Sequence, residues 1–199
     1  MIKPLIIGIT GGIGGGKSTL AEKLRSEGFE VYDSDKEARI LQNEHPVIRE
    51  KLIELFGSEI YLGNELNRIE LGSIVFKKSE LLLKLNAIVH PIVKEHFKNW
   101  IENRQNQKLL FMESAILFES GFNSFVDKVI VITASEDIRI KRVIKRDGSS
   151  VEQVRLRIAN QLPEEKKVAK ADFIIHSDDK QLLVGKMKKI LSQLNESVK

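Results

Sequence analysis

The feature that most constrains this chain is a glycine-rich segment near its N-terminus, residues 11–18, with the sequence Gly-Gly-Ile-Gly-Gly-Gly-Lys-Ser. The segment fits the pattern G-x-x-x-x-G-K-[ST]. An apolar, β-branched stretch at 5–10 precedes it and a helix-forming stretch at 19–25 follows it. A strand before the loop and a helix after it are the context that a phosphate-binding loop requires. The alternative is a glycine-rich turn that binds nothing, and five glycines followed by Lys-Ser make it the weaker interpretation.

The predicted loop binds phosphate mainly through its backbone. Its N–H groups and the N-terminus of the following helix converge on an anion. Lys17 is expected to reach the β- and γ-phosphates of a nucleotide, and the Ser18 hydroxyl is expected to bind Mg²⁺. The residues assigned to the nucleotide site here are Gly12, Ile13, Gly14, Gly15, Gly16, Lys17, Ser18 and Thr19.

Composition places the chain among ordinary globular proteins, since 42% of its 199 residues are hydrophobic and 30% are charged. The length favours one domain with a proper core. Without cysteine, neither disulfides nor thiolate metal sites can form. The N-terminus enters a strand directly, and neither a signal peptide nor a membrane-spanning run is present, so we expect a cytoplasmic protein without membrane contact. The net charge of +4 suits small anionic ligands as well as nucleic acid.

Strand and helix patterns alternate along most of the chain. Apolar, β-branched stretches predict strands at 5–10, 29–33, 108–113, 126–133 and 172–176, and an apolar stripe predicts a final helix at about 180–195. Such near-continuous Val/Ile/Leu runs with helices between them indicate a parallel sheet covered on both faces. The predicted fold is therefore an α/β fold of the P-loop kinase type.

Residues 35–107 interrupt this alternation and contain no convincing strand. Pro46 can occupy the first turn of a helix, and Asn67 can cap another. A long helix is predicted from about Ser79, and Pro91 must kink or interrupt it. Because ligands bind outside the carboxyl ends of parallel strands, where this insertion emerges, we expect a substrate-binding subdomain. The alternative is that the insertion only buttresses the core.

Acidic residues stand at two predicted strand ends. Asp33 and Asp35 follow the second strand, where a carboxylate can accept or orient the proton of an attacking hydroxyl. Asp also caps helices well, so the alternative for Asp33 or Asp35 is the N-cap of the following helix. Both roles can hold, with Asp35 as the cap and Asp33 as the catalyst. Glu113, at the end of the third strand, serves either Mg²⁺ or a substrate, or is an ordinary loop carboxylate. His90 and His96 lack metal-ligand spacing, so no histidine metal site is expected.

A basic run covers residues 139–170, with ten Lys or Arg against four acids. Most of these side chains, Lys167 among them, are expected to form a solvated helical surface. At least two of the arginines are expected to belong to a cationic lid over the polyphosphate, which closes when substrates bind. A nucleic-acid interface is not expected, because the run contains no aromatic residue for base stacking. A regulatory GTPase is excluded because the strand ending at Thr133 is followed by Ala-Ser-Glu-Asp rather than N-K-x-D.

An ordered set of motifs over essentially the whole chain resembles the dephospho-coenzyme A kinase family. Residues 7–19 are similar to its G-[LI]-T-G-G-I-[GA]-S-G-K-S-T start. In the first half of the chain, Asp33-Ser34-Asp35 matches D-[AS]-D, Asn67-Arg68 and Leu71 match D/N-R-x-x-L, Val75-Phe76 matches V/I-F, and Leu85 to Pro91 match L-N-x-I-x-H-P. In the second half, Lys141-Arg142 and Lys145-Arg146-Asp147 resemble the lid motif R-x-x-x-R-D, Arg157 and Gln161 match R-x-x-x-Q, and Ala171 to Ile175 match A-D-x-x-I. The loop alone is shared by many NTPases, but the ordered set is not.

The resemblance implies one kinase domain of three parts: a core of about 1–34, 108–138 and 171–199, a helical coenzyme A subdomain of about 35–107, and a lid of about 139–170. It implies transfer of the γ-phosphoryl group of ATP, with Mg²⁺, to the ribose 3′-hydroxyl of dephospho-CoA. Lys17, Asp33 and Arg142 are then catalytic, and Arg142 and Arg146 contact ATP. The implied substrate contacts are Asp33, Arg68, Asn86, His90, Pro91 and Glu113. Another P-loop kinase, for a nucleoside or nucleotide, is the rival. The oligomeric state stays open, with a monomer favoured.

Overall fold

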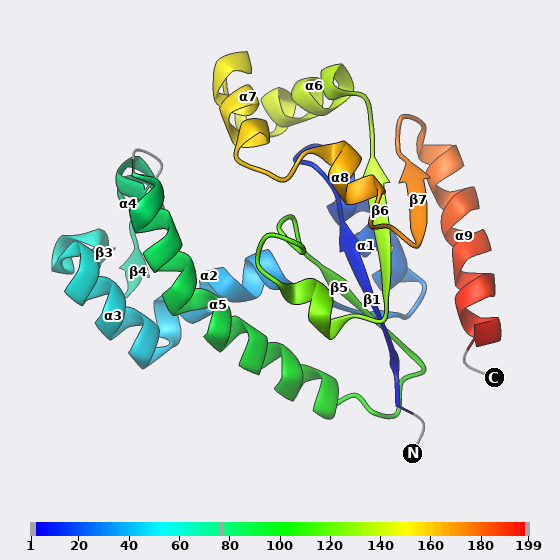
Figure 1. Cartoon of the computed structure of the whole chain (residues 1–199), viewed down its shortest axis with the longest axis horizontal. Coiled ribbons are helices and arrows are strands. Elements are labelled where there is room, and N and C mark those ends of the chain that lie inside the picture. The colour runs from blue at the N-terminus through cyan, green and yellow to red at the C-terminus, as the bar shows by residue number, and fades with distance from the viewer. Residues whose placement is uncertain (1–2, 76–77, 198–199) are drawn as a thin grey trace. The chain divides into compact units, whose positions relative to one another are not determined.

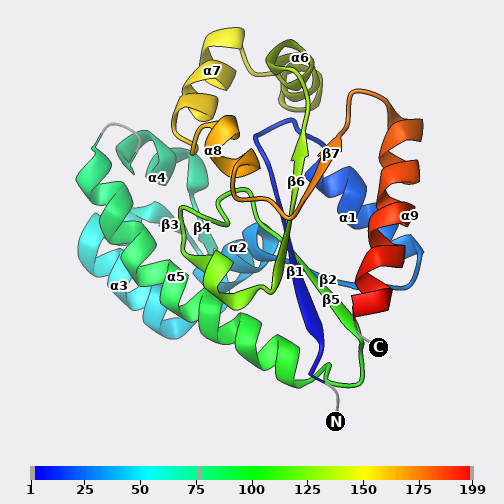
Figure 2. The same ribbon diagram turned by 45° about the vertical axis from the view of Figure 1, so that its right-hand side comes forward.

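The computed structural model describes residues 3–75 and 78–197, and within these the chain divides into two compact units (Figures 1 and 2). The first unit comprises Met1–Asp33 and Arg104–Lys199, and the second comprises Ser34–Asn103. Phe76, which belongs to one of the family-like motifs, lies outside the described residues. Each unit is described by itself below.

The first unit is built on a five-stranded sheet in the order β2-β5-β1-β6-β7, with every neighbouring pair parallel. The strands are β1 (Leu5–Thr10), β2 (Glu30–Asp33), β5 (Leu109–Glu113), β6 (Lys128–Thr133) and β7 (Phe173–His176). The prediction of a parallel α/β sheet is thus confirmed, with strand boundaries shifted by at most two residues. Since all strands run the same way, their carboxyl ends meet at one edge, and the loop after β1 lies between β5 and β6 at that edge.

Helices cover both faces of this sheet. The helices of the first unit are α1 (Lys17–Ser26), α6 (Glu136–Asp147), α7 (Val151–Ala159), α8 (Glu164–Val168) and α9 (Lys180–Ser197), with a 3₁₀ turn η2 (Phe122–Phe125). Figures 1 and 2 show α1 and α9 together on one side of the sheet and α8 against β6 on the other. The core between the sheet, α1 and α9 contains Ile7, Ile9, Leu20, Leu24, Phe111, Ile130, Ile132, Ile175, Leu183, Met187, Ile190 and Leu194. The apolar stripe predicted for the last helix is therefore confirmed.

The second unit is mainly helical. It contains α2 (Ser34–Glu44), α3 (Pro46–Phe56), a 3₁₀ turn η1 (Ser58–Ile60), β3 (Tyr61–Leu62), β4 (Glu65–Leu66), α4 (Arg68–Val75) and α5 (Ser79–Glu102). Pro46 occupies the first turn of α3, as predicted. The Asn67 side chain accepts a hydrogen bond from the Glu70 N–H at 3.1 Å, which confirms it as the cap of α4.

One expectation for this unit is wrong, and one of the two alternatives for Pro91 is excluded. The segment is not free of strands, because β3 and β4 form an antiparallel hairpin around Gly63, whose φ of 63° permits the tight turn. Strands of two residues are too short to show a period of two in the sequence. Interruption at Pro91 does not occur either, because α5 continues through it from Ser79 to Glu102. One missing N–H is tolerated in a helix that buries Val89, Val93 and Phe97 along its length.

Candidate active site

The glycine-rich loop closes tightly at the carboxyl end of β1 and leads directly into α1. The Gly15 N–H donates to the Gly12 carbonyl at 3.0 Å, and Gly16 precedes the helix with a φ of 98°. Gly14 has a φ of 75°, and a Cβ there would lie 2.5 Å from the Arg139 carbonyl oxygen, so only glycine fits. Helix α1 therefore begins directly at the loop, and the backbone N–H groups at a helix N-terminus are a general binding site for phosphate.

Lys17 points back over this loop. Its Nζ donates to the carbonyls of Gly11 at 3.0 Å and Gly12 at 3.2 Å, and the residue is 8% exposed. The ammonium group is therefore held at the mouth of the loop by backbone oxygens. A positive charge in this position stabilises the negative charge of a bound polyphosphate.

Ser18, the predicted metal ligand, lies beside Glu113, for which a role toward either Mg²⁺ or a substrate is expected. The Ser18 hydroxyl donates to Glu113 Oε1 at 3.0 Å. Glu113 ends β5 and is 6% exposed, so it is a buried carboxylate and the alternative of an ordinary loop acid is wrong. Hydroxyl and carboxylate oxygens are the donors that Mg²⁺ prefers, so this pair fits the ion. Among the described residues, no group of three or more His, Asp or Glu side chains is arranged to hold a metal.

Asp33 lies at the carboxyl end of β2, in register with Glu113 on the adjacent β5. The parallel pairing therefore places both carboxylates at the edge of the sheet from which the glycine loop emerges. Helix α2 begins at Ser34, so Asp35 belongs to its first turn and does not precede it. The expectation that Asp35 is the helix cap is accordingly wrong, because the helix starts two residues earlier than a cap at Asp35 implies.

Arg142 of α6 reaches the glycine loop. Its guanidinium donates to the Ser177 carbonyl at 2.6 Å and to the Ser177 hydroxyl at 2.9 Å, and lies 3.4 Å from the Gly14 carbonyl. Ser177, buried directly after β7, in turn donates to the Gly15 carbonyl at 2.6 Å. The predicted ATP contact Arg142 thus lies beside the loop already and needs no large displacement of α6 to reach it.

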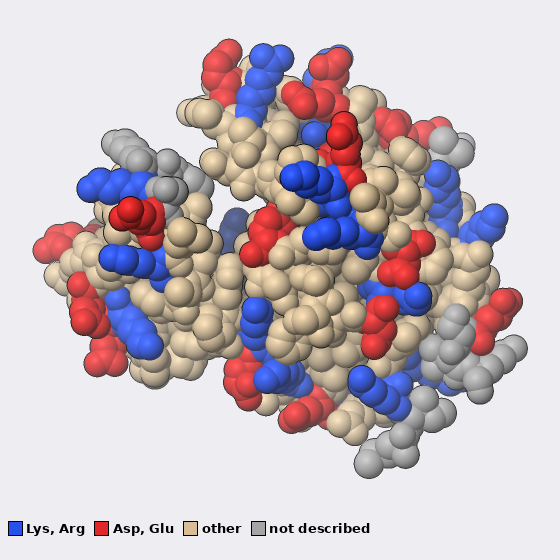
Figure 3. All heavy atoms as spheres, viewed as in Figure 1, with Lys and Arg blue, Asp and Glu red and all other residues tan. Residues whose placement is uncertain are grey.

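Arg146, the second predicted arginine of the lid, is engaged elsewhere. It lies one turn further along α6, pairs with Asp147 at 2.6 Å, and its side chain is 58% exposed. Asp147 also pairs with Arg157 at 2.8 Å, and these two guanidinium groups hold the pKa of the Asp147 carboxyl far below its ordinary value. Figure 3 shows acidic and basic side chains interleaved at the top of the view, over α6 and α7, so the basic run is partly neutralised there.

The expectation that Lys167 is a solvated surface residue is wrong. It is fully buried in α8, where its Nζ lies 3.1 Å from Glu119 Oε1 and donates to the Ala115 carbonyl at 2.9 Å. The Glu119 carboxylate also accepts from the Leu162 N–H at 2.8 Å. Lys167 therefore fastens α8 to the segment after β5, which a charge count along the sequence cannot show.

The substrate residues predicted in residues 34–103 lie on two helices of the second unit. Arg68 at the start of α4 donates to Gln42 Oε1 at 2.6 Å and to the Arg39 carbonyl at 2.8 Å. Asn86 and His90 stand one turn apart on α5, so they share a face of that helix, and the adjacent Pro91 is exposed. Burial, with a smaller contribution from Lys94, lowers the pKa of His90, which favours its neutral form.

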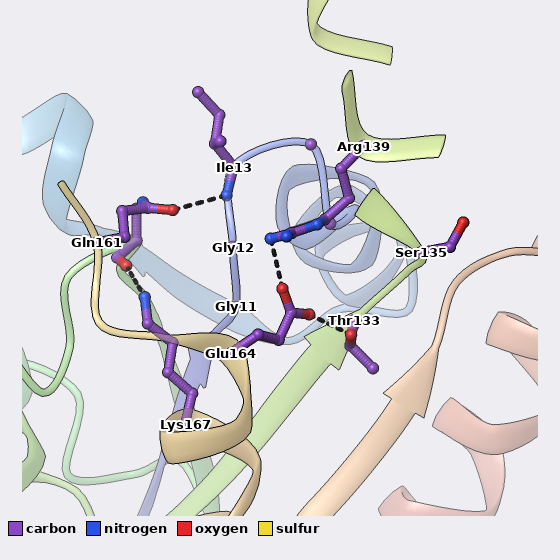
Figure 4. Close-up of polar contacts among 12 residues, drawn as sticks. Gly11, Gly12, Ile13, Thr133, Ser135, Arg139, Gln161, Glu164 and Lys167 are labelled. Carbon is purple, nitrogen blue, oxygen red and sulfur yellow. Dashed lines mark hydrogen bonds and ion pairs between the residues drawn. The ribbon is translucent and has the colours of Figure 1, made fainter. Parts of the chain in front are cut away.

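Four residues around the loop were missed as site residues. Ser177 follows the last strand, Gln161 was matched to a motif without a role, and Arg139 and Glu164 were counted only as charges. The Arg139 guanidinium lies over Gly12 and pairs with Glu164, which accepts a hydrogen bond from the Thr133 hydroxyl (Figure 4). For Ser177, the sequence offered one sign of a role in the site, namely its place directly after the last predicted strand. The other three act through partners more than 24 residues away in the chain.

The fold and the loop together show to which class of protein this chain belongs. A parallel sheet with a G-x-x-x-x-G-K-S loop after its central strand, a lysine over the loop and a Ser-carboxylate pair beside it is a P-loop kinase core. A search of family models matches residues 5–182 to dephospho-CoA kinase. The chain belongs to the dephospho-CoA kinase family. It is thus a phosphotransferase of an ATP-using family, and its family activity, the phosphorylation of dephospho-CoA, is the final step of coenzyme A biosynthesis.

Individual relatives agree over nearly the full length. The chain is 42% identical to dephospho-CoA kinase of Porphyromonas gingivalis over 189 residues, covering 94% of this chain and 93% of the relative. It is 38% identical to the Bacteroides fragilis enzyme over 192 residues, covering 96% and 94%. A Thermus thermophilus protein of known crystal structure superposes with a TM-score of 0.85 at 35% identity, over 96% of this chain and 98% of that one. None of the helices within residues 3–75 and 78–197 combines the length and the hydrophobicity that a membrane span requires.

Proposed function

We propose that this chain transfers the γ-phosphoryl group of ATP to the ribose 3′-hydroxyl of dephospho-CoA, with the glycine loop as the ATP site. The observation that supports the proposal is the loop itself, which leads directly into the N-terminus of α1 and has Lys17 held over it by the carbonyls of Gly11 and Gly12. A phosphoryl group in transfer carries charge on three oxygens, and fixed dipoles and cations stabilise that charge without reorganising.

Asp33 is the residue proposed to receive or orient the proton of the attacking hydroxyl. Its carboxylate ends the strand next to Glu113, at the edge of the sheet where the glycine loop lies. A positioned carboxylate removes the proton as the oxygen bonds to phosphorus, and the leaving group is ADP. Such a base typically contributes about 10²–10⁴-fold to the rate.

Mg²⁺ is proposed to be held by Ser18, with Glu113 beside it directly or through water. The contact of 3.0 Å between their oxygens supports this assignment. When bound, the ion neutralises charge on the β- and γ-phosphates. Arg142 is proposed to add positive charge from the lid, and Ser177 fixes the direction of its guanidinium.

The 34–103 unit is proposed to bind the coenzyme A part of the acceptor. Asn86 and His90 on one face of α5 offer an amide and a neutral imidazole as hydrogen-bonding groups. Arg68 is proposed to interact with anionic groups of the acceptor. Its hydrogen bonds to the Arg39 carbonyl and to Gln42 direct the guanidinium. A cytoplasmic location, where ATP is available, completes the proposal.

An acceptor panel tests the proposal. Purified protein with ATP and Mg²⁺ is offered dephospho-CoA, a nucleoside and a nucleoside monophosphate, and ADP release is followed for each. Dephospho-CoA should give by far the highest kcat/KM, and a folded Lys17→Ala variant serves as the inactive control. Faster phosphorylation of the nucleoside or nucleotide would instead establish the rival kinase.

A further inference from the structure

The tip of the glycine loop contacts residues of the predicted lid, about 139–170. These contacts have no part in the function proposed for the site. The Ile13 N–H donates to Gln161 Oε1 at 2.9 Å, although 148 positions separate the two residues. Gln161 belongs to the connection between α7 and α8, and Figure 4 shows its amide oxygen aimed at the Ile13 nitrogen. One backbone donor of the loop is therefore satisfied by the lid.

The Ile13 side chain is held by the same part of the molecule. It packs against a small apolar cluster formed by Ile140 and Val143 of α6 and Val154 of α7, with Ile144 and Ile158 at its margin. The lid has few other buried apolar groups, so Ile13 is a substantial part of its small core. Backbone and side chain of a single loop residue thus join the loop to α6 and α7.

The neighbouring glycines let α6 approach close enough for these contacts to form. A Cβ on Gly12 would lie 1.7 Å from Arg139 Nη1, so the absence of a side chain there makes room for the guanidinium. Glu164, three residues after Gln161, pairs with that guanidinium and accepts from Thr133 of β6. The connection 161–164 is consequently fixed to the core on one side and to the loop on the other.

We propose that Ile13 and Gln161 form an anchor through which the lid sets the conformation of the glycine loop, with Gln161 a positioning residue for ATP. Because the Ile13 N–H donates to Gln161, the loop backbone is held in one conformation, in which other amides of the loop and of the start of α1 receive the phosphate. A loop that loses this contact samples other conformations, and small misplacements of binding groups are costly in rate. The inference rests on the ATP site proposed above.

The Gln161→Met variant tests the anchor, since methionine has a similar length but offers no strong acceptor. We expect kcat/KM for ATP to fall about tenfold, the effect of one lost hydrogen bond in a restrained site, while KM for dephospho-CoA changes less than about twofold. The Ile13 amide should also exchange with deuterium faster, as read by NMR without any substrate. Asn160→Ala, an exposed neighbour, is the control and should change neither quantity.

A second variant separates positioning from general destabilisation. Gln161→Glu keeps an acceptor, so protection of the Ile13 amide should return to near the wild-type value. Its carboxylate lies near the polyphosphate, and KM for ATP should therefore rise with pH as the carboxylate ionises. Unchanged Ile13 exchange in Gln161→Met would overturn the anchor, as would equal losses toward both substrates. Because amide exchange needs no turnover, failure of the anchor is distinguishable from failure of the proposed reaction.

Discussion

Replacement of Lys167 by alanine should destabilise the chain strongly, although the residue lies in a run of basic residues. Lys167 is fully buried, donates to the Ala115 carbonyl at 2.9 Å, and lies 3.1 Å from Glu119. A hydrogen bond from a charged donor contributes about 1.5–3 kcal/mol. The ion pair adds about 1 kcal/mol, since the Glu119 side chain is 24% exposed and water screens part of the attraction.

These contributions predict a loss of about 3 kcal/mol in the free energy of unfolding for Lys167→Ala. For a chain of this size, that loss corresponds to a fall in Tm of about 6–12 °C. Urea denaturation followed by circular dichroism measures the free energy directly. The matched control is Lys166→Ala, because Lys166 is the exposed neighbour, and it should stay within about 0.5 kcal/mol of wild type.

A double-mutant cycle isolates the pair. Lys167→Met, Glu119→Gln and the combined variant should show a coupling energy of about 1 kcal/mol, because each single change leaves the other partner without its counter-ion. Loss of less than about 0.5 kcal/mol in Lys167→Ala, or a coupling indistinguishable from zero, would refute the reasoning and return Lys167 to the solvated surface.

Three further predictions concern the site and the helical unit. Asp33→Asn should lower kcat by about 10²-fold or more in steady-state assays while the Kd for ATP, measured by calorimetry, is unchanged; weaker ATP binding at normal kcat would assign Asp33 to the nucleotide instead. Arg142→Ala should reduce kcat/KM for ATP at least about tenfold, whereas Arg146→Ala, exposed and paired with Asp147, should reduce it less than about threefold, and equal effects would contradict the difference drawn between them. Burial lowers the pKa of His90, so the unfolded chain takes up this proton first as the pH falls below about 6.5 and stability drops with acidification; His90→Gln should lose less stability than wild type between pH 7 and 5 in urea titrations, and an identical loss would argue against a neutral His90.

The sequence predicts those parts of the fold that are encoded locally. The strand before the loop, the loop and α1 are contiguous, and the buried strands β5 and β6 show as continuous apolar stretches. Asn67 and Pro46 act within their own helices, so their roles are also readable from neighbouring residues. The edge of the sheet that holds the candidate site follows from the same logic, since parallel strands bring Asp33 and Glu113 together there.

The structural features that the sequence does not predict depend on contacts between residues far apart in the chain. Lysine is ordinarily exposed, and the Ala115 carbonyl and the Glu119 carboxylate, both far away in sequence, make burial of Lys167 tolerable. Gln161 meets Ile13 across 148 positions, and Arg139 meets the loop because Gly12 leaves room for it. Contacts with distant parts of the chain also explain why α5 continues through Pro91. Burial of its apolar face stabilises the helix and offsets the one missing hydrogen bond.

The position of the new phosphate group in the product decides whether the chain phosphorylates the ribose 3′-hydroxyl of dephospho-CoA. Dephospho-CoA is converted by the purified protein with ATP and Mg²⁺, and the product is examined by ³¹P and ¹H NMR. The proposed reaction predicts a single new phosphate monoester, coupled to the ribose 3′ proton, with one ADP released per molecule formed. A monoester on the 2′-oxygen or on the pantetheine arm, or ADP release without any new phosphate ester, would contradict the account.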